Sequence, residues 1–206
     1  MEELRSLKAN QLDALREVAN IGAGHAATAL SQMTNRTIMI SVPEVNVRPL
    51  EEVADLLGAP DSVVAAVLMQ MMGDLTGRTL IIFPAESARR LCDILFSRSD
   101  GSTTSFGEME ESGLKEVGNI LVSAYLNALS DFMGMMLVPS VPGLVVDQSA
   151  AVITSTYLNF GQEREFVFCV ETSFQVGKER ERLDGHFLLL PDMPSLRAIF
   201  DAIRLP

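Results

Sequence analysis

Apolar residues recur every three or four positions through residues 8–33 and again through a segment that starts at residue 106. This spacing places them along one face of an α-helix and leaves polar residues on the opposite face. Three acidic residues stand near the start of the second segment, where they suit the positive end of a helix dipole. The pattern predicts two long amphipathic helices.

Shorter apolar runs, bounded by Gly, Pro or charged residues, are typical of strands. Because short turns join the longer runs, antiparallel pairing is expected rather than a doubly wound parallel sheet. The expected fold class is α+β, with long helices packed on a largely antiparallel sheet. The expected strands are residues 37–42, 63–72, 79–83, 136–141, 166–176 and 186–190, and the expected shorter helices are residues 50–57, 85–96, 144–156 and 193–203.

The chain repeats itself at an offset of 99 residues. Residues 13–43, placed without a gap on residues 112–142, give 11 identical pairs in 31 positions. A Ser-, Thr- and Gly-rich stretch at residues 97–105 separates the two copies. We predict an internal duplication of two α-β units, about residues 1–100 and 101–206, related by pseudo-two-fold symmetry within one domain spanning 1–206.

Each long helix carries a carboxylate and an amide three residues apart on its polar face. Glu17 and Asn20 form the first pair, and Glu116 and Asn119 form the second pair. At 100° per residue, both pairs fall about 150° from the apolar stripe. Asn is a mediocre helix former, so helix propensity does not explain its appearance twice. The alternative is residual duplication on an ordinary solvated surface.

The pairs belong to a longer pattern, Asp/Ser-x3-Glu-x2-Asn-x22-Pro, which occurs twice. Its positions are Asp13, Glu17, Asn20 and Pro43 in the first copy and Ser112, Glu116, Asn119 and Pro142 in the second. With this pattern and the phrases Glu-Val-Ala-Asn-Ile-Gly-Ala-Gly-His and Glu-Val-Gly-Asn-Ile, the chain resembles the CheC/CheX/FliY family of bacterial chemotaxis phosphatases. The resemblance covers essentially the whole chain, and two complete motifs fit the CheC branch of that family.

The resemblance implies a phosphatase that hydrolyses the aspartyl phosphate on the response regulator CheY. It makes Glu17, Asn20, Glu116 and Asn119 the catalytic residues, with the remaining motif positions in support. It also implies a partnership with the receptor deamidase CheD, which would bind the chain and stimulate it.

The chemistry can also be argued from the residues. An acyl phosphate needs an aligned water and charge stabilisation, because its leaving carboxylate is good. A side-chain amide both donates and accepts hydrogen bonds, so Asn20 or Asn119 can hold a water in line with phosphorus. Glu17 or Glu116 would bind a lysine at the rim of the receiver's site. Mg²⁺ is expected on the CheY substrate, and no cofactor of the chain's own is expected.

Composition limits the other function classes. Sixteen Lys and Arg against 27 Asp and Glu give a net charge of −11, which argues against nucleic-acid binding and against docking on an anionic membrane. The two His and two Cys are scattered singly, which argues against a structural zinc site and a disulfide scaffold. The charged N-terminus lacks a signal-peptide apolar stretch, so a cytoplasmic location without membrane insertion is expected.

Two local signals compete with this interpretation. Cys92 and Arg98 have the Cys-x5-Arg spacing of cysteine-dependent phosphatases, but the segment is expected to be a helix end without a Gly-rich phosphate cradle. We therefore expect the spacing to be coincidental. His25 follows the first pair but points away from its stripe, and it is expected to be a flank or core histidine rather than a general base.

One further segment bears on CheD. Asp147 and Gln148 stand among small residues, in a pattern similar to the amides on which receptor deamidases act. The hypothesis is that the expected helix at residues 144–156 docks in CheD as a substrate mimic, with Asp147 nearest the active site. An amphipathic surface helix is the alternative.

Two other function classes stay open. The chain could be a non-catalytic CheD-binding regulator or receiver-docking adaptor, although an adaptor would not need the amide in both copies. A structural protein of the flagellar switch is a third class, which we favour less because nothing follows Pro206 that could serve as an assembly domain.

Overall fold

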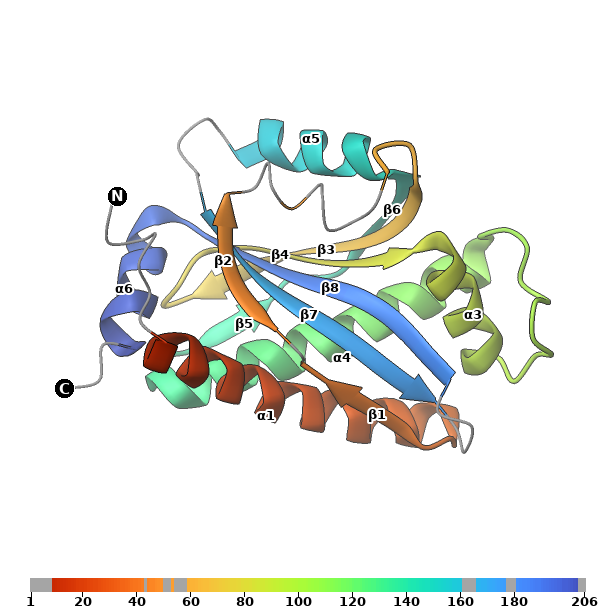
Figure 1. The fold of residues 1–206 in the computed structure, drawn as a ribbon, viewed down its shortest axis with the longest axis horizontal. Helices are drawn as coiled ribbons and strands as arrows, with labels where there is room; N and C mark the ends of the chain where they lie inside the picture. Colours follow the sequence, from red (N-terminus) through yellow and green to blue (C-terminus); the bar gives the residue numbers. More distant parts are fainter. Residues whose placement is uncertain are drawn as a thin grey trace.

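Two long helices, α1 (Ala9–Thr34) and α4 (Glu108–Met133), run antiparallel along one face of a sheet (Figure 1). The computed structural model describes residues 9–42, 44–49, 53, 59–160, 166–176 and 181–203. Both helices bury one apolar stripe against the sheet and leave the opposite stripe exposed, as their sequence period predicts. The two predicted long helices are therefore confirmed.

The sheet has eight strands within the part of the chain that the structure describes, and all their pairings are antiparallel. Their order is β1-β7-β8-β4-β3-β5, with β2 also paired to β7 and β6 also paired to β3. The α+β class and the antiparallel sheet are therefore confirmed. The strands are β1 (Ile38–Ser41), β2 (Val45–Pro49), β3 (Val63–Gly73), β4 (Gly77–Pro84), β5 (Leu137–Pro139), β6 (Gly143–Gln148), β7 (Phe166–Val176) and β8 (Glu181–Pro191).

Strands from the two halves of the sequence interlock in this sheet. The short strands β1 and β2 of the first half pair with β7 of the second half, and β5 and β6 of the second half pair with β3 of the first. The strands β4 and β8 meet in the middle. Neither half can therefore complete its part of the sheet without the other.

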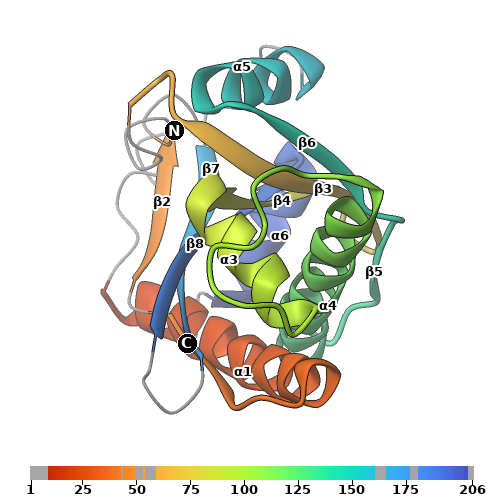
Figure 2. The same cartoon turned by 90° about the vertical axis from the view of Figure 1, so that its right-hand side faces the viewer.

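The remaining helices cover the two faces unequally. The helices α3 (Ala85–Leu95) and α6 (Met193–Ile203) contribute buried residues to the same core as α1 and α4, whereas α5 (Ser149–Phe160) packs over a smaller core on the opposite face (Figures 1 and 2). Alternate residues of each central strand enter the two cores, as the pleat requires. None of the described helices is both long and apolar enough to cross a membrane.

The two long helices end in the same way. Asn35 and Gly134, which are 99 positions apart, both adopt positive φ, 51° and 65°. The hydroxyl of Ser31 accepts a hydrogen bond from the Ile38 N–H at 2.9 Å, and that of Ser130 donates to the Met135 carbonyl. A left-handed residue stops each helix, and a serine one turn earlier fixes the chain that leads to the next strand.

Three sequence expectations need correction. Residues 144–148 form strand β6 rather than the start of a helix, because they pair with β3. Strand β2 was not expected, and β8 begins at residue 181 rather than 186 because its first residues pair with β7 beyond the end of β4. The helix expected at residues 50–57 lies outside the described residues, except for Val53.

Gly22 lets α1 approach α4 closely. A Cβ at this position would lie 2.8 Å from Tyr125 Cδ1, 3.0 Å from Tyr125 Cα and 3.1 Å from the Ala124 carbonyl oxygen. The Tyr125 ring cannot move aside easily, since it stacks on Phe187 with 4.6 Å between ring centroids. Its hydroxyl also lies 3.2 Å from Thr172 Oγ1.

Replacing Gly22 and Gly24 by alanine separates packing from helix propensity. We expect Gly22→Ala to lower the free energy of unfolding by about 1–2 kcal/mol, because overpacking outweighs the gain in propensity. Gly24→Ala should raise it by about 0.5–1 kcal/mol, because Gly24 is exposed and its added Cβ would meet nothing within 4 Å. Urea unfolding measures both, and equal stabilities for the two variants would contradict the contact.

Candidate functional site

The first pair lies on the solvent-facing side of α1. Glu17 and Asn20 are exposed, and so is Asp13 one turn earlier. The opposite side of the same helix is buried, with Ala23 and Leu30 almost fully inaccessible. The outward orientation expected from the apolar period is confirmed for these residues, while their catalytic role stays a prediction.

The second pair occupies the matching positions on α4. Glu116 and Ser112 are exposed, Asn119 is half-buried, and Val117 and Leu121 on the opposite side are buried. Both pairs therefore look away from the sheet on the same side of the molecule. The second amide is more enclosed than the first.

Among the residues that the structure describes, no hydrogen bond or ion pair involves the side chains of Glu17, Asn20, Glu116 or Asn119. The two carboxylates can therefore accept hydrogen bonds from a partner, and the two amides can both donate and accept them.

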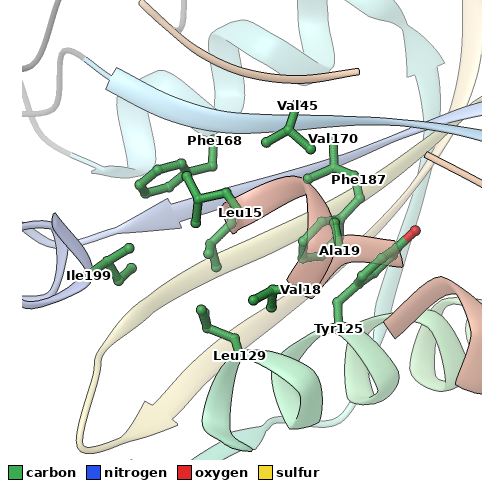
Figure 3. Close-up of a pocket in the computed structure, with 11 residues that line it drawn as sticks. Leu15, Val18, Ala19, Val45, Tyr125, Leu129, Phe168, Val170, Phe187 and Ile199 are labelled. Atoms are coloured by element: carbon green, nitrogen blue, oxygen red, sulfur yellow. The ribbon is translucent and has the colours of Figure 1, made fainter. Parts of the chain in front are cut away.

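The helix segments behind the two pairs are supported differently. A Cβ on Gly118, between Glu116 and Asn119, would lie 2.5 Å from Val67 Cγ1, so α4 sits directly on β3. Ala19, at the matching position of α1, borders a cavity of about 50 Å³ (Figure 3). The lining is apolar apart from the Tyr125 hydroxyl, so the cavity supplies no catalytic group. The lining residues are Leu15, Val18, Ala19, Val45, Tyr125, Leu129, Phe168, Val170, Phe187, Leu189 and Ile199.

A polar cluster holds the N-terminus of α4. The Arg98 guanidinium binds Glu110 at 2.6 Å, and the Glu110 carboxylate also accepts the Gly107 N–H at 2.9 Å. Asp93, which is buried, accepts the N–H and the hydroxyl of Thr103 at 2.9 and 2.7 Å. These contacts fix the loop before α4, and with it the turn that leads to the second pair.

The Cys-x5-Arg segment lacks the features of a cysteine-phosphatase site. Cys92 is buried in α3, and burial, reinforced by Glu110, raises the pKa of its thiol to about 12. Arg98 is committed to Glu110 and Thr103. A thiolate nucleophile facing a phosphate is therefore not formed here.

The two histidines lie apart. His25 is exposed on α1, so of the two expected alternatives the structure favours the flank over the core. His186 is half-buried in β8, and burial lowers its pKa despite the nearby Glu171 and Asp184. The described part of the chain contains no group of three or more His, Cys, Asp or Glu that could hold a metal ion.

Asp147 and Gln148 lie on strand β6 and not on the helix expected there. Both side chains are exposed, and the Gln148 N–H donates to Asp147 Oδ1 at 2.7 Å. The helix α5 begins one residue later at Ser149, which is buried and donates to the Ala59 carbonyl at 3.1 Å. The two residues therefore project from a strand at the edge of the sheet.

Of the two motif prolines, the structure describes Pro142. Pro142 is half-buried in the loop between β5 and β6, while Pro43 lies outside the described residues. In the Pro142 loop, the Ser140 N–H donates to the Gln70 carbonyl at 2.9 Å and Ser140 Oγ accepts the Gln70 N–H at 2.9 Å. This loop joins the end of the second repeat segment to β3.

Comparison with known proteins shows the family to which the chain belongs. A model of the CheC-like family matches residues 11–47 and 109–146, the two segments that contain the pairs. The CheY-P phosphatase CheC of Bacillus subtilis (strain 168) is 37% identical over 205 residues, which cover 98% of each chain. The chain belongs to the CheC-like family.

Two FliY proteins are more distantly similar to this CheC-like chain. The flagellar motor switch phosphatase FliY of Bacillus subtilis (strain 168) is 26% identical over 129 residues, or 62% of this chain and 33% of that protein. The crystal structure of Thermotoga maritima FliY superposes with a TM-score of 0.78 at 18% identity, covering 96% of this chain and 97% of that one. The similarity to the Thermotoga maritima FliY structure shows a shared fold.

The sequence interpretation of this CheC-like chain did not single out the isoleucine that follows the amide in each pair. Ile21 directly follows Asn20, and 46% of its surface is exposed although it is a large aliphatic residue. Ile120 follows Asn119 in the same way and is half-buried. The available signal was that both positions are isoleucine in the aligned repeats.

The polar cluster before α4 predicts sensitivity to acid. Burial raises the Asp93 pKa, but the hydrogen bonds from Thr103 more than offset this, and Arg98 lowers the Glu110 pKa. Stability from both carboxylates is therefore complete above their ordinary values of 3.8 and 4.5 and is lost as pH falls through the lowered ones. We expect Asp93→Asn to cost about 1–3 kcal/mol at pH 7 and to lose less stability than the wild type on acidification. Urea unfolding at pH 7 and about pH 3 tests this, and identical pH dependence would contradict it.

Proposed function

We propose that this CheC-like chain hydrolyses the aspartyl phosphate of phosphorylated CheY. The observation that carries the proposal is the pair of outward-facing Glu–Asn sets, at matching positions on α1 and α4. The name of the Bacillus subtilis relative, CheY-P phosphatase, gives the same substrate. Cys92, which a cysteine-phosphatase mechanism would need, is buried, and burial raises the pKa of its thiol to about 12, which disfavours the thiolate.

The reaction needs little from the phosphatase beyond position. A water oxygen attacks phosphorus, the bond from phosphorus to the aspartyl oxygen breaks, and carboxylate and inorganic phosphate are released. The side-chain carbonyl oxygen of Asn20 or Asn119 would accept a hydrogen bond from that water and hold the water oxygen in line with phosphorus. Mg²⁺ on CheY would neutralise the charge on the phosphoryl oxygens, so the proposal requires no metal from this chain.

The glutamates would set the register of docking. Glu17 and Glu116 lie one turn before the amides and are exposed, so each carboxylate can reach a lysine at the rim of a receiver's site. An ion pair at that point would orient the receiver before the amide meets the water. Removal of either glutamate should therefore weaken binding of CheY more than it slows hydrolysis at saturation.

Two pseudo-equivalent sites imply that each amide supports turnover alone. We expect Asn20→Ala and Asn119→Ala each to retain part of the phosphate-release rate with phosphorylated CheY. The double variant should lose at least about 100-fold, because nothing aligns the water. Phosphate release at saturating CheY measures these rates, with thermal unfolding to verify the fold.

Cys92→Ala is the matched control for that series. It removes the one residue that a cysteine-phosphatase mechanism would require, and it should leave phosphate release unchanged. Full activity in the double-Asn variant, or loss of activity in Cys92→Ala with an intact fold, would contradict the proposed mechanism. A double variant that binds CheY normally yet releases no phosphate would support it over a receiver-docking adaptor.

We also propose that CheD binds at the junction of β6 and α5. The exposed Asp147 and Gln148 project from an edge strand, and Ser149 anchors the junction to the loop before β3. A carboxylate and an amide in a fixed, exposed segment next to small residues could enter the site of a deamidase. We propose further that the chain is an internal duplication folded as a single domain, and that it is located in the cytoplasm.

Substitution of Asp147 tests the CheD contact. Asp147→Ala should weaken CheD binding, and Asp147→Lys should weaken it further because it reverses the charge. Asp131→Lys is the matched control, since Asp131 is an exposed acid near the end of α4 and outside the junction. Titration calorimetry with CheD measures the affinities, and unchanged binding in both Asp147 variants would rule the junction out.

A further inference from the structure

The two Glu–Asn pairs lie close together along the helix pair. Gly22 stands level with Ala124 and Tyr125, and the two helices run in opposite directions (Figure 1). Asn20 precedes this level by two residues on α1. Asn119 precedes it by five to six residues on α4. Because the helices are antiparallel, Asn119 lies on the opposite side of this level from Asn20. At 1.5 Å per residue, the two amides are separated by roughly 11 Å along the helix axes.

The separation across the helices is also small. Packed helices have axes about 8–10 Å apart, and the glycine contact keeps this pair at close approach. Both pairs face away from the sheet, so the Cα atoms of the two asparagines lie roughly 15 Å apart on one surface.

Two positions that lie between the pairs along the helix axes carry small residues. Gly24, exposed on α1, has no neighbour within 4 Å of where its Cβ would be, and Ser123 stands at the same level on α4. No bulky side chain from these two positions divides the surface into two separate sites. The pairs are therefore two positions on one continuous face.

A docked protein domain needs more room than this. A standard protein–protein interface covers about 800 Å² on each partner, a patch roughly 30 Å across, and a small domain has about the same diameter. Two such patches centred roughly 15 Å apart overlap by about half. A receiver at either pair would cover the other.

We propose that the two pairs are mutually exclusive docking positions, so that one chain binds one phosphorylated receiver at a time. This inference rests on the proposed function, because it needs both pairs to bind the receiver. The second pair then adds an alternative orientation for the same partner, not a second bound partner. The association constants of the two positions add, while the stoichiometry stays at one.

Titration calorimetry with CheY activated by beryllofluoride tests this directly. The wild type should bind one CheY per chain at saturation. Glu17→Lys and Glu116→Lys, which reverse the docking charge at one pair each, should also bind one CheY. Their association constants should sum to that of the wild type, a loss of about two-fold in each if the pairs are equal. Analytical ultracentrifugation of the saturated mixtures gives the mass of the complex independently.

Each other outcome identifies which claim fails. Two CheY molecules per wild-type chain and one per variant would overturn mutual exclusion while leaving the phosphatase proposal intact. Abolished binding in one variant alone, with no change in the other, would also overturn it, because only one pair would then dock. No binding of activated CheY by the folded wild type would instead refute the proposed function.

Discussion

The close contact between Gly22 and Tyr125 is the constraint on which the rest of the structure depends. At this level the backbone of α1 lies so close to Ala124 and Tyr125 of α4 that there is no room for a Cβ on Gly22. Tyr125 also stacks on Phe187 and meets Thr172, so the same side chain joins the helix pair to β7 and β8. Because both Glu–Asn pairs are carried by these two helices, this contact sets their spacing and their common direction.

Interlocked strands make that arrangement rigid as a whole. Each half of the sequence completes the sheet of the other, so the two long helices cannot separate without breaking strand pairs such as β1 with β7 and β5 with β3. The proposed hydrolysis requires little beyond this placement of the two helices. In the proposed function, an acyl phosphate is hydrolysed once a water is aligned, and an amide on either long helix would provide that alignment. The proposed mechanism therefore requires no enclosing pocket around the Glu–Asn pairs.

Long periodic segments were predictable because local pattern and tertiary structure agree in them. The apolar period of α1 and α4 placed Glu17 and Glu116 on exposed faces, and the repeat offset found both pairs. Strand β6 was mistaken for a helix because its apolar run, Leu144–Val146, is short and lies just before the residues of α5, and only pairing with the distant β3 makes it extended. The half-burial of Asn119 and the cavity beside Ala19 could not be predicted either, because they depend on how closely each helix sits on its strands.

A structure of this chain in complex with CheY carrying beryllofluoride at its phosphorylation site tests the central claim most directly. We predict the side-chain amide of Asn20 or Asn119 within about 3 Å of a water, or of the position of the attacking oxygen, in line with the beryllium centre. The glutamate of the same pair should contact a lysine of CheY. A complex in which the phosphorylation site of CheY meets a surface remote from both pairs would contradict the account.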